Sequence, residues 1–220
     1  MFSATLLCTP QYKGNMKDRQ LTAFFRRLVE GLAAPLPESF THVEFDTPIS
    51  FREVVRSHSL GRDTILIFAG HGNESALLGP TLTGTTGYSI FYDSTLLNFG
   101  PRSLLAFCCS SATLLGRQFK ESISQTYLGF LNKMMFITVE GEPTDWWRYI
   151  FQSIANQVMA DAKVSLTVKE LADDVYQQAY IYFRYGEGSN HEWAPLIANF
   201  LYDQKQALCV FSDKLPGVAP

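Results

Sequence analysis

The sequence predicts an α/β fold with a mostly parallel central sheet and helices on both of its faces. Short apolar runs rich in Ile, Leu and Val alternate with longer segments whose apolar residues recur every three or four positions. The runs at 64–70 and 103–108 are apolar along almost their whole length, as in strands that are buried on both faces. With 220 residues, of which 46% are apolar and 18% charged, we expect one domain over residues 1–220.

The first half of the chain is expected to hold three strands and two helices. An apolar strand at 3–8 opens the chain, and after a loop Asp18 can cap a helix that runs to about Ala33. Apolar residues in that helix recur at helical spacing, and Pro35 and Pro37 end it. The remaining elements expected in this half are a strand at 40–45, a short helix at 51–57 and a strand at 64–70.

The second half begins with an insertion at about 73–100, rich in Gly, Thr and Ser, that we expect to form a hairpin or long loop. At the far end, residues 193–202 fit a helix, but a strand that turns at 203–206 and pairs with a strand at 208–211 fits the β-rich composition better. Between these segments we expect strands at 103–108 and 134–139 and helices at 111–122, 145–160 and 167–185.

Two of the expected strands end in residues with catalytic chemistry. His71, between two glycines, follows the strand at 64–70, and Cys109 ends the strand at 103–108. Sites on open parallel sheets form outside the carboxyl ends of the strands, so we expect imidazole and thiol to meet there. An imidazole can accept the proton of a thiol and later return it to a leaving amine.

Further groups fit the same chemistry. The backbone N–H groups of Gly72 and Cys109 are natural donors to an oxyanion, because glycine has no side chain to obstruct the approach. The helix expected after Cys109 would favour the thiolate through its N-terminal dipole. Strand alternation directs Cys108 to the opposite side of the sheet, into the core.

The two motifs, Ala-Gly-His-Gly at 69–72 and Phe-Cys-Cys-Ser-Ser-Ala at 107–112, resemble those of caspase-like (clan CD) cysteine peptidases. The similarity is closest to the CHAT and separase branch, which has a small residue before the nucleophilic cysteine where this chain has Cys108. Weaker likeness to CHAT domains lies at 127–130, near Glu140 and at 191–194, so the resemblance covers about residues 1–212.

This resemblance implies a three-layer sandwich and an intracellular cysteine endopeptidase that cleaves a protein or peptide substrate with a His71–Cys109 dyad. It implies no metal or organic cofactor. It also implies regulated proteolysis, as in bacterial antiviral defence or cell death, and control by a separate activating or inhibiting protein. The alternative is a catalytically silent module of the same fold that binds a partner protein through the insertion at 73–100.

The residue that the peptidase would prefer before the scissile bond is less defined by the sequence. Glu140 and Asp145 follow the expected strand at 134–139, and a carboxylate there would receive a Lys or Arg side chain. Lys13 and Lys17 would instead receive an acidic one. We expect the basic preference, although Glu140 and Asp145 also suit the start of a helix.

Composition argues against several other classes. A net charge of −3 gives no general attraction to nucleic acid. No stretch approaches 18 apolar residues, and the start has no basic segment before its short apolar run, so neither a membrane span nor a signal peptide is expected. The four cysteines have no zinc-site spacing, and two are adjacent, which does not suit a disulfide framework. A reducing cytoplasm is therefore the expected location.

Overall fold

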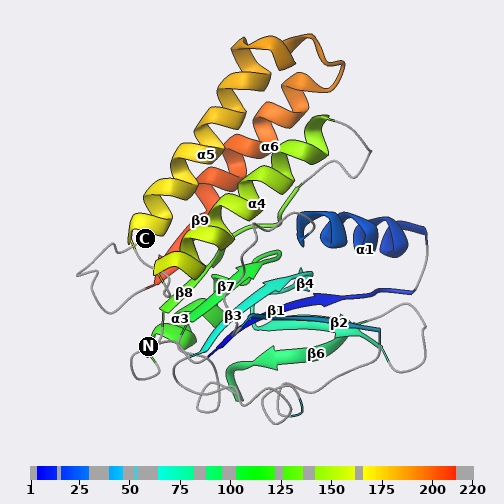
Figure 1. Cartoon of the computed structure of the whole chain (residues 1–220), viewed down its shortest axis with the longest axis vertical. Coiled ribbons are helices and arrows are strands. Elements are labelled where there is room, and N and C mark those ends of the chain that lie inside the picture. Colours follow the sequence, from blue (N-terminus) through cyan, green and yellow to red (C-terminus); the bar gives the residue numbers. More distant parts are fainter. Residues whose placement is uncertain are drawn as a thin grey trace.

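A computed structural model describes residues 4–13, 16–29, 40–46, 53, 64–81, 88–95, 103–121, 126–135, 142–161 and 166–211. Its centre is a six-stranded sheet in the order β2-β1-β3-β7-β8-β9 (Figure 1). Five strands run parallel and the edge strand β9 is antiparallel, so the expected mostly parallel sheet is confirmed. The strands are β1 (Ala4–Pro10), β2 (Phe40–Phe45), β3 (Thr64–Ala69), β7 (Ser103–Phe107), β8 (Thr126–Phe130) and β9 (Leu208–Phe211).

The central strands β3 and β7 are buried at every position, which explains their continuous apolar sequences. Their side chains alternate between two hydrophobic cores. Ile65, Ile67, Leu105 and Phe107 lie in the larger core on one face, and Leu66, Phe68, Leu104 and Ala106 lie in the smaller core on the other.

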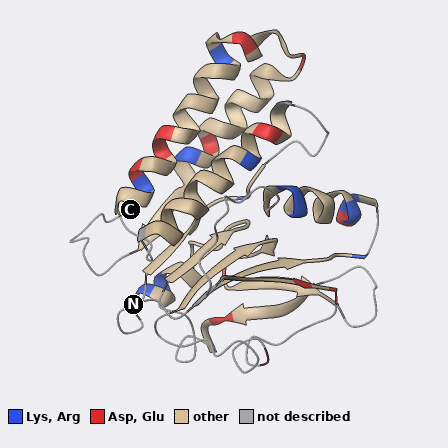
Figure 2. Cartoon of the chain, in the orientation of Figure 1, with Lys and Arg blue, Asp and Glu red and all other residues tan. Residues whose placement is uncertain are grey.

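The larger core is covered by four helices, α1 (Met16–Val29), α4 (Glu142–Asp161), α5 (Leu166–Tyr185) and α6 (Ala194–Ala207). A 3-10 turn, η2 (Glu187–Asn190), lies between α5 and α6. Helices α4, α5 and α6 lie side by side and extend well beyond the sheet (Figure 1). Acidic and basic residues are interspersed over α1 and this bundle (Figure 2). Along the described parts of the chain, no helix combines the length and apolarity needed to cross a bilayer.

The smaller core is covered by helix α3 (Leu115–Glu121) and by a second sheet. That sheet is antiparallel and comprises β4 (His71–Gly72), β5 (Ala76–Pro80) and β6 (Tyr88–Asp93). Leu77, Phe91 and Tyr92 of the second sheet pack against β3 and β7 through this core. The described part of the insertion expected at about 73–100 thus contains β5 and β6, and the sheet that they form begins at β4, which is His71 and Gly72.

The expected pairing of a strand at 193–202 with one at 208–211 was wrong. Residues 194–202 belong to helix α6, because Ala194, Ile197, Ala198 and Leu201 form one buried face at helical spacing against α5. The strand at 208–211 exists as β9, but its partner is β8. Of the strand expected at 134–139, Met134 and Met135 are irregular, and residues 136–139 lie outside the described part. The strand that pairs with β7 is β8.

Strand β8 was not expected from the sequence, because Gly129 weakens its strand pattern. Packing nevertheless requires a glycine at this position. A Cβ atom at Gly129 would lie 2.6 Å from Tyr127 Cε1 and 2.7 Å from Ser111 Oγ. Both neighbours are fully buried, and the Tyr127 hydroxyl donates a hydrogen bond of 2.9 Å to the Ser111 carbonyl. A larger residue would therefore disturb the turn that follows Cys109.

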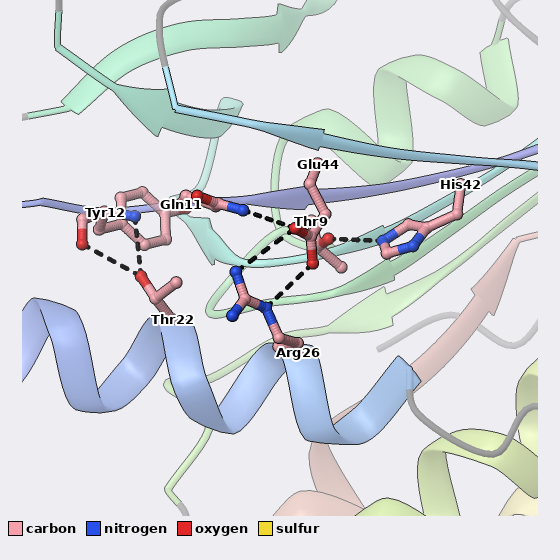
Figure 3. A network of polar contacts seen from close by, with 7 residues as sticks. All are labelled: Thr9, Gln11, Tyr12, Thr22, Arg26, His42 and Glu44. Atoms are coloured by element: carbon pink, nitrogen blue, oxygen red, sulfur yellow. Dashed lines mark hydrogen bonds and ion pairs between the residues drawn. The ribbon is translucent and has the colours of Figure 1, made fainter.

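Helix α1 is tied to the sheet by a polar network (Figure 3). Arg26 pairs with Glu44 of β2, Nε to Oε1 at 3.1 Å, and Gln11 Nε2 donates to the same carboxylate at 2.6 Å. Thr22 Oγ1 accepts a hydrogen bond of 2.8 Å from the backbone N–H of Tyr12. The network fixes the segment after β1 and with it the Tyr12 side chain, which reaches the candidate site.

Gly129→Ala is expected to lower the free energy of unfolding by about 1–3 kcal/mol, since the added methyl group overpacks a buried region. Chemical denaturation followed by circular dichroism measures this. Gly79→Ala in β5 is the control, because its nearest neighbours would be farther, at 3.0 and 3.6 Å, and a smaller loss is expected. Equal losses for the two variants would contradict the packing argument.

Candidate active site

Cys109 lies at a sharp turn directly after β7. The turn needs a backbone with φ of 52° at Ser110, in the left-handed region that residues other than glycine seldom adopt. Ser110 N–H donates to the Asn132 carbonyl and Ala112 N–H to the Phe130 carbonyl, each at 2.9 Å. The segment that follows β8 therefore supports the strained turn.

The Cys109 thiol is partly buried and has a specific donor. The backbone N–H of Met134 donates to Cys109 Sγ at 3.3 Å, and the thiol lies 3.9 Å from the Met134 carbonyl oxygen. Burial raises the pKa of Cys109, while the Met134 N–H and the nearby charge of Lys133 act in the opposite direction. The surroundings thus hold a thiol while offering stabilisation to a thiolate.

Gly72 lies against the two cysteines. A Cβ atom at this position would lie 2.5 Å from Cys108 Sγ and 3.0 Å from the Cys109 carbonyl oxygen, so only glycine fits. Cys108 is 1% exposed and points into the smaller core, where burial raises the pKa of its thiol strongly. The structure thus brings together Gly72 and Cys109, the two residues expected to supply oxyanion donors.

A cavity of about 550 Å³ opens beside the Cys109 thiol. Its walls come from the segment after β4, the turn after β7 and the segment after β8. The lining residues are Gly72, Asn73, Glu74, Ser75, Cys109, Ser110 and Lys133.

The first segment of that wall is firmly held. Asn73 Oδ1 accepts hydrogen bonds from the N–H groups of Ser75 and Ala76, at 2.9 and 2.8 Å. The Glu74 carbonyl accepts from the N–H groups of Leu114 and Leu115. Asn73, Glu74, Ser75 and Lys133 were not expected to line a site, although the polar run directly after His71-Gly72 is a signal for the first three.

His71 lies in an aromatic pocket. Its ring centroid is 4.6 Å from that of Tyr12 and 4.3 Å from that of Tyr88. The backbone N–H of His71 donates to the Tyr12 hydroxyl at 2.8 Å, and this hydroxyl donates to the Leu78 carbonyl at 2.8 Å. Tyr12 therefore holds both the backbone and the ring of His71.

The imidazole is neutral at pH 7. Burial lowers the pKa of His71 to about 4, and the charge of Asp18 opposes this shift. Asp18 itself accepts a hydrogen bond of 3.3 Å from the Tyr88 hydroxyl. Among the described residues, no polar atom makes a hydrogen bond to the buried His71 Nε2. The neutral ring is thus in the form of a base, and within the described part of the chain its Nε2 receives no hydrogen bond.

His71 and Cys109 are brought to the same edge of the sheet by strand pairing. The register places Ala69 opposite Phe107, and each candidate residue follows its strand by two positions. The side chains, however, have different surroundings. The thiol lines the cavity, the imidazole packs between Tyr12 and Tyr88, and no hydrogen bond joins them among the described residues. The catalytic dyad therefore stays a prediction.

The residues expected to bind substrate are placed less favourably. Asp145 is exposed at the start of α4, where its carboxylate pairs with Arg148 at 2.5 Å, and it does not line the cavity. Glu140 lies outside the described residues. Lys13 pairs with Asp46 at 2.5 Å. In the described part of the chain, no cluster of three or more His, Cys, Asp or Glu suits a metal ion.

Comparison with known proteins adds information about the fold. No protein-family model matches the chain, and no curated protein matches it. It is similar to the Arg-specific cysteine proteinase gingipain R, with a TM-score of 0.51, 10% identity, and coverage of 96% of this chain and 46% of that one. A complex of the pro- and mature domains of RgpB from Porphyromonas gingivalis gives a TM-score of 0.54, 9% identity, and coverage of 96% and 47%.

The chain has a caspase-like fold. Its mostly parallel sheet and flanking helices match those of the cysteine proteinases, as the two sequence motifs implied. The chain spans just under half the length of the two proteinase chains. Sequence identity near 10% makes this a likeness of fold.

Opening the aromatic pocket is expected to raise the pKa of His71. Tyr88→Ala exposes the imidazole to water, so its pKa moves from about 4 towards the ordinary value of 6.5. The imidazole signals in an NMR titration measure it. Tyr149→Ala, which removes a similarly exposed tyrosine on α4, is the control.

The same variant is expected to change the pH dependence of stability. Because the folded protein protonates His71 only near pH 4, while the unfolded chain does so near 6.5, the free energy of unfolding falls as the pH drops through this window. Tyr88→Ala should reduce that fall. A His71 pKa that remains near 4 in the variant would contradict the proposed role of burial.

Proposed function

We propose that this protein is a cysteine endopeptidase in which Cys109 is the nucleophile and His71 the base. The observation that carries the proposal is the meeting of Cys109 and Gly72 at the carboxyl ends of β3 and β7, beside an open cavity. The fold of the cysteine proteinases supports the same reaction class.

In the proposed reaction, His71 takes the thiol proton and the thiolate attacks the carbonyl carbon of a peptide bond. The backbone N–H groups of Gly72 and Cys109 stabilise the oxyanion. The C–N bond then breaks, the amine leaves with the proton from the imidazolium, and water hydrolyses the thioester. The N–H of Met134 would favour the thiolate before each attack.

The reaction requires the His71 ring to turn from the aromatic pocket towards the thiol. Among the residues that the structure describes, none bonds to the buried Nε2, which makes the observed position costly by about 1–3 kcal/mol for a lost hydrogen bond. Tyr88, which covers the ring, is partly exposed on β6, so a substrate or partner can reach it. We propose that such contact releases the imidazole.

The second candidate function is a catalytically silent module that binds a partner protein. The observation that favours it is the separation of the surroundings of His71 and Cys109. A peptide carrying a thiol-reactive group separates the two functions. Labelling of Cys109 that depends on His71 supports the peptidase. Absence of labelling in the presence of candidate activating proteins supports the silent module.

The biological setting of the proposal rests on the motifs at 69–72 and 107–112. Their resemblance to the CHAT and separase branch suggests regulated proteolysis in bacterial antiviral defence or cell death, within the cytoplasm. A separate protein would activate or inhibit the enzyme. RgpB was solved as a complex of its pro- and mature domains, which gives a precedent in this fold for a proteinase domain in complex with a separate domain. Recovery of only a monomeric, fully active enzyme from cells would count against such control.

Cys109→Ala is expected to reduce kcat/KM by at least about a thousandfold, because the nucleophile is lost. His71→Ala should give a loss of similar size. Cys108→Ala is the matched control: it should keep most of the activity and lose roughly 1 kcal/mol of stability through reduced burial. Cleavage of a denatured protein mixture, followed by mass spectrometry, measures activity without a known substrate. If Cys108→Ala were inactive and Cys109→Ala active, the assignment of the nucleophile would be wrong.

The preferred residue before the scissile bond is expected to be Arg or Lys. Glu74 is the carboxylate in the cavity wall, and Glu140 and Asp145 are the proposed carboxylates for a side chain that reaches beyond it. A panel of fluorogenic peptides with Arg, Lys, Asp or Leu at that position should show at least about a tenfold preference for the basic residues, since a hydrogen bond to a charged group contributes about 1.5–3 kcal/mol. Glu74→Gln and Asp145→Asn identify the carboxylate responsible. A preference for Asp would overturn the assignment and favour Lys133 as the determinant.

A further inference from the structure

Gln204 is a buried polar residue among the apolar residues of the helix bundle. It lies on α6 and is 2% exposed. A buried amide costs free energy unless its donors and its acceptor are hydrogen-bonded, so its partners define its role.

The Gln204 amide connects the bundle to the segment that follows β8. Its Oε1 accepts hydrogen bonds from Trp147 Nε1 of α4 at 3.3 Å and from the Tyr176 hydroxyl of α5 at 3.2 Å. Because the indole N–H can only donate, it fixes which end of the amide is the oxygen. The Nε2 group is therefore directed away from these donors, and it donates to the backbone carbonyl of Met135.

Met135 follows the residue that contacts the candidate nucleophile. Met134 N–H donates to Cys109 Sγ at 3.3 Å, and Met134 is 5% exposed. Both methionines lie outside any helix or strand, so no ladder of backbone hydrogen bonds fixes their conformation. Closer to β8, the backbone is held by Leu131 N–H, which donates to the Ala207 carbonyl at 2.8 Å. The side-chain bond from Gln204 thus fixes the far side of the contact with the thiol.

We propose that Gln204 is a positioning residue for the candidate nucleophile, holding Met134 and Met135 so that the Met134 N–H is aimed at Cys109 Sγ. The proposal rests on the proposed function in taking Cys109 as the nucleophile. It assigns to the helix bundle, which forms no wall of the cavity, a direct part in preparing the thiolate. A purely structural role of Gln204, satisfying Trp147 and Tyr176, would affect stability and leave the thiol unchanged.

The test measures the thiol itself and needs no substrate. The rate of alkylation of Cys109 by iodoacetamide is followed against pH by mass spectrometry of the peptide, with Cys109→Ala as the blank. Gln204→Glu keeps an acceptor for Trp147 and Tyr176 but removes the donor to Met135, and Gln204→Met removes both functions at similar volume. Trp147→Phe is the control, because it weakens the bundle and leaves the bond to Met135.

Both Gln204 variants are expected to move the midpoint of alkylation up by about one pH unit, with about a tenfold slower reaction at pH 7. Trp147→Phe should lower the melting temperature and leave the midpoint unchanged. Folded Gln204 variants with the parental midpoint would overturn the proposal, and so would an equal shift in Trp147→Phe. If the Gln204 variants do not fold, hydrogen exchange in the unmodified protein decides: slow exchange of the Met134 amide supports the proposal, and fast exchange overturns it.

This experiment is independent of peptidase activity. A shifted midpoint in a protein that cleaves no peptide and is not labelled by the thiol-reactive peptide, even with candidate activating proteins present, would leave the role of Gln204 intact and refute the proposed function. Cleavage by an enzyme whose thiol ignores Gln204 would refute only the present inference.

Discussion

The candidate site depends on the parallel pairing of β3 with β7. Both strands are completely buried, and their register matches Ile65 with Ser103 and Ala69 with Phe107. This register makes the two strands end together, so the segments beginning at His71 and Cys109 share one edge. A slip by one residue would move every side chain of a strand to the opposite core. Because both cores are apolar and closely packed around these strands, such a slip would be costly, and the position of the cysteines follows from packing alone.

Gly72 makes the contact between the two segments close. No side chain is tolerated between its backbone and Cys108 Sγ, and Cys108 in turn fills the smaller core. The adjacent cysteines thus have distinct roles that result from strand alternation. Cys108 packs against Gly72 from the smaller core, and Cys109 lines the cavity. The buried Cys108 before the candidate nucleophile is consequently part of how this edge of the sheet is packed.

Most of the sheet and the long helices could be predicted because their burial is expressed in local patterns. Strands β1, β3 and β7 are continuous apolar runs, and α4 and α5 have regular apolar faces. Strand β8 was not predicted, because Gly129 interrupts its apolar pattern. That glycine is required by close contact with the Tyr127 ring and Ser111, which a local pattern does not reveal. The start of helix α6 was expected to be a strand. Its buried residues Ala194 and Ala198 are small and indicate a helix only through their close packing against α5, which the sequence does not show.

The site shows the same division between local and distant causes. The positions of His71 and Cys109 at strand ends follow from sequence, whereas the orientation of the imidazole is set by Tyr12, in the segment after β1, and by Tyr88 of β6. The walls of the cavity come from three separate segments. No spacing of residues in the sequence predicts that Lys133 and Ser110 line the same cavity.

The two candidate catalytic residues are held by different layers, and their states of preparation differ accordingly. The Cys109 thiol has a backbone donor in the segment after β8, and Cys109 lines the open cavity, whereas the imidazole is enclosed by Tyr12 and by Tyr88 of the small sheet. Nε2 has no hydrogen-bond partner in the described part of the chain, which costs about 1–3 kcal/mol, and two aromatic contacts contribute about 0.5–1.5 kcal/mol each. These opposing terms are of similar size, so the resting position of the ring is only weakly favoured. A ligand that binds the alternative position better by a few kcal/mol would reverse the populations. Control of this site is therefore expected to act through the small sheet, because His71 lies in β4 and Tyr88 of β6 covers its ring.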